Sequence, residues 1–531
     1  MATVKAGASK PDTPVYKTFE DYPIEDLLQY AGVDCLVTTG VLNKVFPRVI
    51  ERKPYIYHRL GVREVRPAPA IIDFMEKVEM PAHEFLIDLE INGVRYDVDL
   101  NRRQSAQIEE ELPKLDDEIF TLYGTRFNPD SGKELSKILY GDLGFTPPSY
   151  TKKKEPSVDG DALGELAATH NLEWLRKLAR RNNVASVYRT FFKTYVEDFV
   201  KSDGRVHSSY SLFGTSSFRP SGQFPNMTQI PNTQTENRLG YSIKQCYTVD
   251  PGNLFLCLDQ SGAEVVMLAF LCRDPKLLRA VAEGKDFHSY SASQMHGLDY
   301  DEMVFHINYE GDDPTILGVK KRFKALRQGA KSLTFGILYG SSVKGIALTL
   351  KITEQEATRL IAMYFKEFPL IETYVNDCHA MAKVNNYIMN IHGQPKRQFG
   401  AMNMFRQTAV YNASLRNSQN VVCQGSSAVT GLYGFSKLNE AIKPMGGRSL
   451  TTVYDSLSME IPYGRIADAI NESFYVMEDL LVETFDWMDF PIRVDVEVGI
   501  NWKQVATVHR GITQEEVQRL MFDKFNVAMP A

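Results

Sequence analysis

Two cationic and two aromatic residues recur at every fourth position in one segment of the chain: Arg327, Lys331, Phe335 and Tyr339. If the segment is helical, steps of four keep these side chains on one face over roughly 18 Å, because a helix rises about 1.5 Å per residue. The face is cationic at its start and aromatic at its end. A nucleoside triphosphate would match this order, with its phosphates at the cations and its sugar and base at the rings. Helices with a solvated cationic end and an aromatic core contact show the same spacing, so the spacing alone leaves both interpretations open.

Two aspartates stand where buried strands are expected. Asp259 directly follows the apolar run 255–258, and Asp455 lies in the apolar segment 450–459. A carboxylate at the end of a buried strand is unfavourable unless it is paired, hydrogen-bonded or bound to a cation. Two such carboxylates predict a site for Mg²⁺ or Mn²⁺, and two ions about 3.5 to 4 Å apart could activate a primer 3′-hydroxyl and stabilise leaving pyrophosphate. The alternative is that Asp259 caps the next helix and Asp455 starts a hairpin turn.

Length and composition indicate a globular protein of several domains, since 531 residues are too many for one compact core. No apolar run approaches the roughly 20 residues of a membrane span, and residues 1–10 lack the apolar segment of a signal peptide. We therefore expect a cytoplasmic protein without a membrane partner. Many DNA-binding domains are basic overall, so the net charge of -6 gives no overall reason to expect DNA binding. Contacts with nucleic acid would need local basic runs such as 320–324.

The expected elements place the aspartates on a sheet and the cationic and aromatic face in a helical region. In the first part of the chain we expect short helices over 17–60, and then a short helix, an Asn92-Gly93 turn and a strand over 85–98. A helical domain follows over 100–202, interrupted at 128–129 and 147–148. We then expect a strand over 254–258, helices to about 430, and two strands, 449–461 and 492–498, around a helix over about 466–485. The chain therefore leaves a sheet, makes a helical excursion and returns.

The order of these features resembles the family A DNA polymerases, typified by bacterial DNA polymerase I and related phage enzymes. The resemblance covers roughly residues 70–505 and is expected to reflect a phage-type member. The family's first palm motif is similar to residues 259–264, followed at the family's spacing by Asp286-Phe-His288, and its fingers helix is similar to 327–340 without a gap. Further motifs of the family resemble 204–210, 215–219, 225–231, 416–425, 453–457 and 499–502.

The resemblance implies a role for each candidate residue. Asp259 and Asp455 would hold two Mg²⁺ ions, with Mn²⁺ as an alternative. The remaining roles would be triphosphate contact for Arg327, Lys331 and His288; the sugar and base pocket for Phe335 and Tyr339; exclusion of a 2′-hydroxyl for Glu264; and contact with template or primer for Arg219, Asn226, Arg416, Asn420, Gln424 and Tyr454. Primer-template DNA and dNTPs are the implied partners, read through backbone and minor groove because such an enzyme must accept any sequence.

The resemblance also implies the fold class, an α+β right-hand polymerase with an antiparallel palm sheet, helical fingers and a helical thumb. A monomer is expected. The expected domains are an exonuclease-like remnant over 1–60, the start of the palm over 61–100, the thumb over 101–205, palm over 206–268, fingers over 269–424, and palm with a C-terminal tail over 425–531.

Some residues depart from the family's pattern. The last palm motif normally reads His-Asp-Glu, whereas this chain has Tyr454-Asp455-Ser456, so one carboxylate near the metals is missing. Gln260 and Gly262 replace the usual Tyr and a common Gln. A stretch over about 300–317, rich in Asp and Glu, is an insertion before the fingers helix.

The N-terminal region departs most. Tyr30-Ala-Gly-Val-Asp34 is similar to the last motif of the family's 3′ to 5′ exonuclease domain, but no Asp-x-Glu precedes it. Asp88-Leu-Glu90 and Asp495-Val-Glu497 come later and are expected to be strand residues. The chain should therefore lack proofreading, because the exonuclease was truncated or is a separate protein that serves as a partner.

The leading hypothesis is template-directed DNA synthesis by two-metal nucleotidyl transfer. A single-subunit RNA polymerase shares the fingers motif, but Glu264 and Phe335 argue against it, because a carboxylate over the sugar excludes ribose. A third hypothesis is a catalytically weak DNA-binding replication subunit, suggested by Ser456 and the missing exonuclease ligands.

Overall fold

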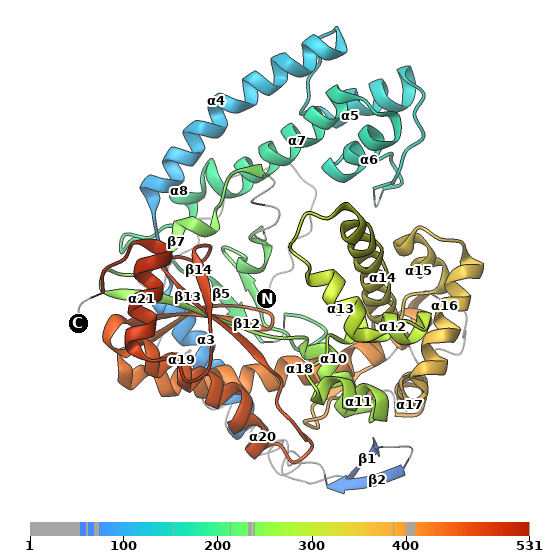
Figure 1. Cartoon of the computed structure of the whole chain (residues 1–531), viewed down its shortest axis with the longest axis vertical. Helices are drawn as coiled ribbons and strands as arrows, with labels where there is room; N and C mark the ends of the chain where they lie inside the picture. The colour runs from blue at the N-terminus through green and yellow to red at the C-terminus, as the bar shows by residue number, and fades with distance from the viewer. Residues whose placement is uncertain are drawn as a thin grey trace, which may run out of the picture.

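The computed structural model describes residues 54–59, 62–67 and 74–529, apart from 152, 213, 232–235, 237–238, 386, 399 and 401–408. The exonuclease-like motif at Tyr30–Asp34 lies outside the described residues. Figure 1 shows a helical arm above, a helical lobe to the right and a central sheet backed by helices. None of the described helices combines the length and the apolar character needed to cross a membrane.

The central sheet has five antiparallel strands in the order β11-β12-β8-β13-β14. Its strands are β8 (Asn253–Gln260), β11 (Arg448–Val453), β12 (Ser456–Pro462), β13 (Val494–Gly499) and β14 (Val505–Val508). Leu254, Leu256 and Leu258 on β8 are fully buried. The apolar residues of β8 thus anchor the strand that carries Asp259.

Helices before and after the strands pack on this sheet and join it to the lobe in one hydrophobic core. They are η2 (Met75–Glu79), α3 (Met80–Asn92), α10 (Ala263–Cys272), α18 (Ala409–Ile442), η8 (Lys443–Met445), η9 (Tyr463–Arg465), α19 (Ile466–Phe474), η10 (Tyr475–Leu480), α20 (Leu481–Thr484) and α21 (Gln514–Phe525). Every residue of α10 is buried. Because α10 follows β8 directly, it carries the chain from the sheet into the lobe.

The arm consists of long helices that return on themselves. Its elements are α4 (Val98–Tyr123), α5 (Gly132–Ser136), η3 (Lys137–Asp142), α6 (Gly160–His170), α7 (Glu173–Val187), η4 (Tyr188–Phe192) and α8 (Tyr195–Phe199). The breaks at 128–129 and 147–148 fall between helices, as the sequence predicts. At its foot lie the three-stranded sheet β4 (Arg205–Val206), β3 (Val94–Tyr96) and β7 (Tyr247–Thr248), the hairpin β5 (Ser209–Ser211) and β6 (Ser221–Gln223), and the turns η5 (Met227–Gln229) and η6 (Lys244–Cys246).

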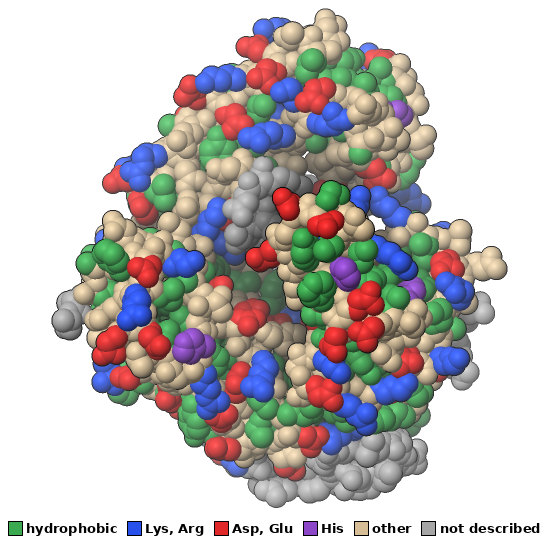
Figure 2. Space-filling view, in the orientation of Figure 1, with side chains coloured by type: hydrophobic (Ala, Val, Ile, Leu, Met, Phe, Trp, Pro, Cys, Tyr) green, Lys and Arg blue, Asp and Glu red, His purple; other side chains and the backbone are tan. Residues whose placement is uncertain are grey.

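In its described residues, the lobe is helical apart from one hairpin. It comprises α11 (Pro275–Ala282), α12 (Phe287–His296), α13 (Tyr300–Asn308), α14 (Pro314–Leu338), α15 (Val343–Leu350), α16 (Glu354–Glu367), α17 (Pro369–Asn385), β9 (Tyr387–Met389) and β10 (Pro395–Arg397). Figure 2 shows that the surface is hollowed between the lobe and the part of the molecule that holds the sheet.

The structure corrects three predicted elements. The expected helix to residue 60 is wrong at its end, since β1 (Pro54–Arg59) pairs with β2 (Val62–Pro67) and its Tyr-Ile-Tyr run favours a strand. Asp88 and Glu90 lie in helix α3 and not in a strand, because the apolar residues around them are spaced for a helix. The segment 449–461 is a hairpin of two strands and not one strand.

Arg205 joins the two sheets of the central region. Its guanidinium donates to Glu460 Oε2 on β12 at 2.7 Å, to Asp250 Oδ2 at 2.9 Å and to the Asn92 carbonyl at 2.7 Å. Arg205 and Glu460 are both buried. Without Arg205, the charge of Glu460 would lose its closest cation.

We expect Arg205→Ala to lower the free energy of unfolding by about 3 to 5 kcal/mol, because it leaves a buried carboxylate without its partner. Urea unfolding followed by tryptophan fluorescence measures the change. Lys177→Ala is the control, since it removes an exposed ion pair with Glu118 that is worth about 1 kcal/mol or less. Equal effects of the two substitutions would contradict this role of Arg205.

Candidate active site

The sheet brings Asp259 and Asp455 together from distant parts of the sequence. Asp259 lies near the end of β8 and pairs across the sheet with Ser456, the first residue of β12. Asp455 lies in the turn between β11 and β12, and its carbonyl accepts from the Gln260 amide at 3.0 Å. The Ser456 hydroxyl donates to the Val453 carbonyl at 2.9 Å. The residue that replaces the family's Glu is therefore used to close the turn.

Two further carboxylates face Asp259, and sequence reasoning missed both. Asp495 on β13 is the direct cross-strand partner of Asp259, and Glu497 follows two residues later on the same face. Ser261 Oγ donates to Asp495 Oδ2 at 2.5 Å. The alternation of Val and acid in 494–498 indicated a common face, but only the register of β13 against β8 shows that this face is the one with Asp259.

The crowding of carboxylates is visible in their pKa values. Desolvation, followed by the charges of Asp455, Asp495 and Glu497, raises the pKa of Asp259 to about 6. Burial also raises the pKa of Asp455, while Arg219 opposes this shift. Negative charge at this edge is therefore incompletely neutralised. Among the described residues no three His, Cys, Asp or Glu side chains converge into a metal-binding group.

Glu264, in the first turn of α10, is a buried centre of hydrogen bonds. It accepts from Arg219 Nη2 at 2.6 Å, from Gln424 Nε2 at 3.1 Å and from the Tyr339 hydroxyl at 2.8 Å. Arg219 Nη2 also lies 3.6 Å from Asp455 Oδ2. Through Glu264, the end of the cationic and aromatic face is linked to the second aspartate.

Arg219 is also held by an aromatic ring. Its guanidinium carbon lies 5.0 Å from the ring centroid of Tyr454, a half-exposed residue with φ of +56° in the β11–β12 turn. A cation over an aromatic face is attracted by the electron-rich ring. The Tyr that stands where the family has His therefore supports the side chain that reaches Asp455.

Helix α14 carries Arg327, Lys331 and Phe335, and Tyr339 is the residue that ends it. The segment is thus helical, as the four-residue spacing predicts. Arg327 donates from Nε and Nη2 to Asp286 at 2.7 and 2.8 Å. Burial acts to raise the pKa of Asp286, but the bonds from Arg327 and Ser289 outweigh it and hold the value at about 2.

His288 lies under the aromatic end of this face. Its ring centroid is 5.5 Å from that of Phe335, and Phe335 is 5.6 Å from Tyr339. Burial, together with the charges of Arg327 and Lys331, lowers the pKa of His288 to about 4, so the ring is neutral at pH 7. Its buried Nδ1 has no hydrogen-bond partner among the described residues.

Besides Arg219 and Tyr454, the predicted DNA-contacting residues lie on α18 and at the start of η5. Arg416, Asn420 and Gln424 occupy one face of α18, and the buried Oδ1 of Asn420 has no partner in the described part of the chain. Arg416 also packs against Gly340, where a Cβ would lie 2.6 Å from Arg416 Cγ. Asn226 caps η5, with its Oδ1 accepting from the Thr228 amide at 3.0 Å.

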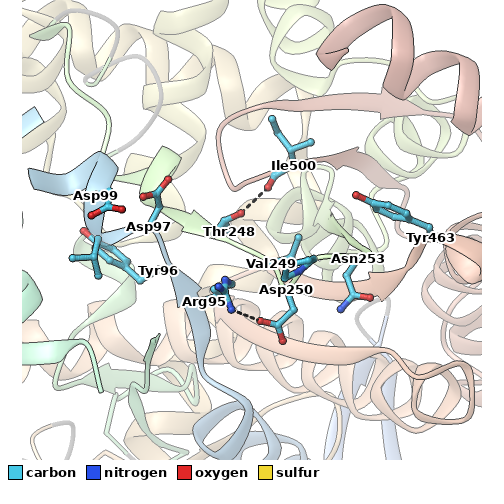
Figure 3. A pocket seen from close by; sticks show the side chains of 12 residues that line it. Arg95, Tyr96, Asp97, Asp99, Thr248, Val249, Asp250, Asn253, Tyr463 and Ile500 are labelled. Carbon is cyan, nitrogen blue, oxygen red and sulfur yellow. Dashed lines mark hydrogen bonds and ion pairs between the residues drawn. The ribbon is translucent and has the colours of Figure 1, made fainter. Parts of the chain in front are cut away.

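A pocket of about 520 Å³ lies away from these residues, between β3, β7 and the start of α4 (Figure 3). Arg95 pairs with Asp250 there at 2.9 Å, and the Thr248 hydroxyl donates to the Ile500 carbonyl at 3.0 Å. None of the predicted site residues lines it. The pocket is therefore separate from the candidate site.

Known proteins share this architecture. The family model described as DNA polymerase family A matches residues 98–504. DNA polymerase I of Rhizobium leguminosarum is 29% identical over 500 residues, which cover 92% of this chain and 44% of that protein. The thermostable DNA polymerase I of Thermus filiformis is 28% identical over 474 residues, which cover 89% of this chain and 51% of that protein. The chain therefore spans about half the length of these relatives.

A solved structure described as "POL domain of Pol1 from M. smegmatis complex with DNA primer-template and dNTP" matches with a TM-score of 0.70 and 24% identity, covering 82% of this chain and 71% of that one. This likeness confirms the predicted α+β polymerase fold. Because the family model matches most of the chain, from residue 98 to residue 504, the chain belongs to DNA polymerase family A.

Proposed function

We propose that this chain is a template-directed DNA polymerase that adds dNTPs to a primer 3′-hydroxyl. One observation carries the proposal. The Tyr339 hydroxyl, Glu264 and Arg219 form a continuous chain of polar contacts that ends at Asp455. A face suited to a triphosphate thus lies next to a pair of carboxylates suited to cations. Two further findings support this assignment: the relatives are named DNA polymerase I, and the similar M. smegmatis structure is a complex with DNA primer-template and dNTP.

The donor set fits divalent cations. Asp259 and Asp455 offer hard oxygen ligands, and the raised pKa of Asp259 reflects negative charge that a cation would stabilise. Two Mg²⁺ ions, or Mn²⁺ in their place, would be held by these aspartates and by phosphate oxygens of the substrate. When bound, such ions lower the pKa of the attacking hydroxyl and stabilise charge on the leaving group.

The chain's own side chains would bind and orient the substrate. Arg327 and Lys331 would pair with the phosphates, and neutral His288 would donate one hydrogen bond to them from a ring nitrogen. Glu264 stands beside Tyr339 where the sugar would lie, and its side chain, held by three hydrogen bonds, would leave no room for a ribose 2′-hydroxyl. Closure of the lobe over the nascent base pair would couple correct pairing to this alignment.

The proposed DNA contacts run from the turn to α18. Arg219 and Tyr454 would meet the primer end, and Arg416, Asn420 and Gln424 would follow the duplex. The unpartnered Oδ1 of Asn420 supports this role, because a buried polar atom without a partner is unfavourable unless a ligand satisfies it. Asn226 would act through η5, whose position its side chain fixes.

We further propose the subdomain assignment implied by the family: thumb over 101–205, fingers over 269–424, and palm over 61–100, 206–268 and 425–531, with an exonuclease remnant over 1–60. The enzyme would act in the cytoplasm as a monomer, with a separate exonuclease or another replisome protein as its partner. The RNA polymerase alternative is disfavoured by Glu264, and competition between rNTPs and dNTPs tests it. Binding of DNA without incorporation would favour the weak-subunit alternative.

Asp455→Ala should lower the single-turnover rate of primer extension by at least about 10³-fold, since one anchor for the ions and the leaving group is lost. A primed template with dNTPs and Mg²⁺ or Mn²⁺ measures the rate, and fluorescence anisotropy checks that DNA still binds. Asp468→Ala, which removes an exposed aspartate paired with Arg465, is the matched control. Wild-type protein that fails to extend the primer, or full activity of Asp455→Ala, would remove the proposal.

The wild-type enzyme should discriminate against dideoxynucleotides, and Phe335→Tyr should reduce that discrimination by at least about tenfold, because a hydroxyl next to the sugar replaces the missing 3′-hydroxyl interaction. The ratio of incorporation efficiencies for ddNTP and dNTP measures the effect. Phe365→Tyr on α16 makes the same chemical change outside the site and should leave the ratio unaltered. Equal use of both nucleotides by the wild type would contradict the role of Phe335.

Asp259→Asn should stabilise the metal-free protein by about 1 kcal/mol at pH 8 after allowance for solvent screening. The pKa of Asp259, about 6, lies above its ordinary 3.8, so the ionised group destabilises the fold above pH 6 and this penalty disappears as the pH falls from 6 towards 4. Unfolding in EDTA at pH 8 and at pH 4 measures the gain in stability, and the exposed substitution Asp301→Asn is the control. Added Mg²⁺ should stabilise the wild type more than the variant. A gain that is independent of pH would argue against this account.

A further inference from the structure

The insertion before the fingers helix lengthens that helix at its phosphate end. Helix α14 begins at Pro314, so about three and a half turns precede Arg327. Asp313 caps its start by accepting from the Thr315 amide at 2.8 Å. These turns come before Arg327, the first residue of the cationic and aromatic face that would bind the triphosphate.

Helix α13 supplies the packing that holds these extra turns. Met303 is fully buried against Phe323 of α14, in a small core that also includes Ala292 and Ala330. Lys320 Nζ donates to the Tyr309 carbonyl just after α13. Figure 1 shows α13 and α14 side by side in the lobe. The insertion thus provides a small hydrophobic core that supports the extra turns of α14.

The extension continues the cationic face. At about 100° per residue, Lys320, Lys324, Arg327 and Lys331 fall within an arc of about 60° on α14. Arg322 points to the opposite side. Lys320 and Arg327 are engaged with Tyr309 and Asp286, whereas Lys324 and Lys331 have no hydrogen bond or ion pair to any other residue that the structure describes. Lys324 is exposed.

The direction of the face assigns a ligand to Lys324. The proposed site places sugar and base at Phe335 and Tyr339 and phosphates at Lys331 and Arg327. One turn further towards the start of α14, about 4.5 Å along the axis, Lys324 lies beyond the last phosphate. A cation at this position would meet the terminal phosphates of a bound triphosphate first.

We propose that Lys324 forms an additional phosphate-binding position, built by the 300–317 insertion, that captures the terminal phosphates of the incoming dNTP and holds released pyrophosphate. This inference rests on the proposed function. No covalent step is assigned to Lys324. A strand of template DNA is the competing occupant of the same charge, and separate measurements of pyrophosphate and DNA binding distinguish the two.

Binding of inorganic pyrophosphate to the whole protein, measured by titration calorimetry, tests the site without catalysis. Lys324→Ala should weaken binding by about 3- to 10-fold at low salt, as expected for loss of one partly solvated charged contact. Arg322→Ala is the matched control, because it removes one charge from the opposite side of the same helix, and it should change binding by less than about twofold.

Steady-state primer extension provides the second measurement. Lys324→Ala should raise the KM for dNTP and the inhibition constant of pyrophosphate by similar factors, with kcat and the Kd for primer-template nearly unchanged. Unaltered pyrophosphate binding, an equal effect of Arg322→Ala, or a change confined to the Kd for DNA would each overturn the proposal. If the wild type binds pyrophosphate through Lys324 but does not extend a primer, the phosphate position stands and the proposed polymerase function fails.

Discussion

The concentration of carboxylates at one edge of a five-stranded sheet is the constraint around which this molecule is arranged. Asp495 is the cross-strand neighbour of Asp259 because β8 pairs with β13, and Asp455 lies in the turn just before β12, which pairs with β8 on the other side. The charges of Asp455, Asp495 and Glu497 disfavour the ionised form of Asp259. The surrounding structure therefore has to be rigid enough to hold them, and the fully buried leucines of β8 together with the buried helix α10 provide that rigidity.

The second level of organisation connects this edge to the lobe. Glu264 belongs to α10, whose chain leaves the sheet, yet its three hydrogen-bond donors come from α18, from the end of α14 and from Arg219. A displacement of α14 therefore changes the surroundings of Glu264 directly. The sheet edge and the cationic and aromatic face of α14 are linked because Glu264 of α10 accepts hydrogen bonds from both Arg219 and Tyr339.

The sequence predicted those features that depend on local periodicity. The helix that carries Arg327, Lys331 and Phe335 follows from side-chain spacing. The breaks predicted at 128–129 and 147–148 fall between helices of the arm, although Pro113 lies inside α4. The sequence did not reveal contacts that depend on strand register, such as Asp495 opposite Asp259 or Arg205 against Glu460, because residues far apart in the chain meet only once the sheet has formed. The misassignment of Asp88 and Glu90 has a different origin: the three residues 88–90 alternate as in a strand, whereas the helical spacing shows only over the longer run of buried residues from Ala82 to Leu89.

Arg219 lies close enough to Asp455 for a cation at that carboxylate to compete with it. Such competition is reciprocal: a cation bound at Asp455 would weaken the contact with the guanidinium by the same factor as that contact weakens binding of the cation. The ring of Tyr454 and the carboxylate of Glu264 provide Arg219 with alternative partners, so its release from Asp455 need not leave it unpaired. Binding of a cation at Asp455 and release of Arg219 from that carboxylate would therefore be coupled in a single equilibrium.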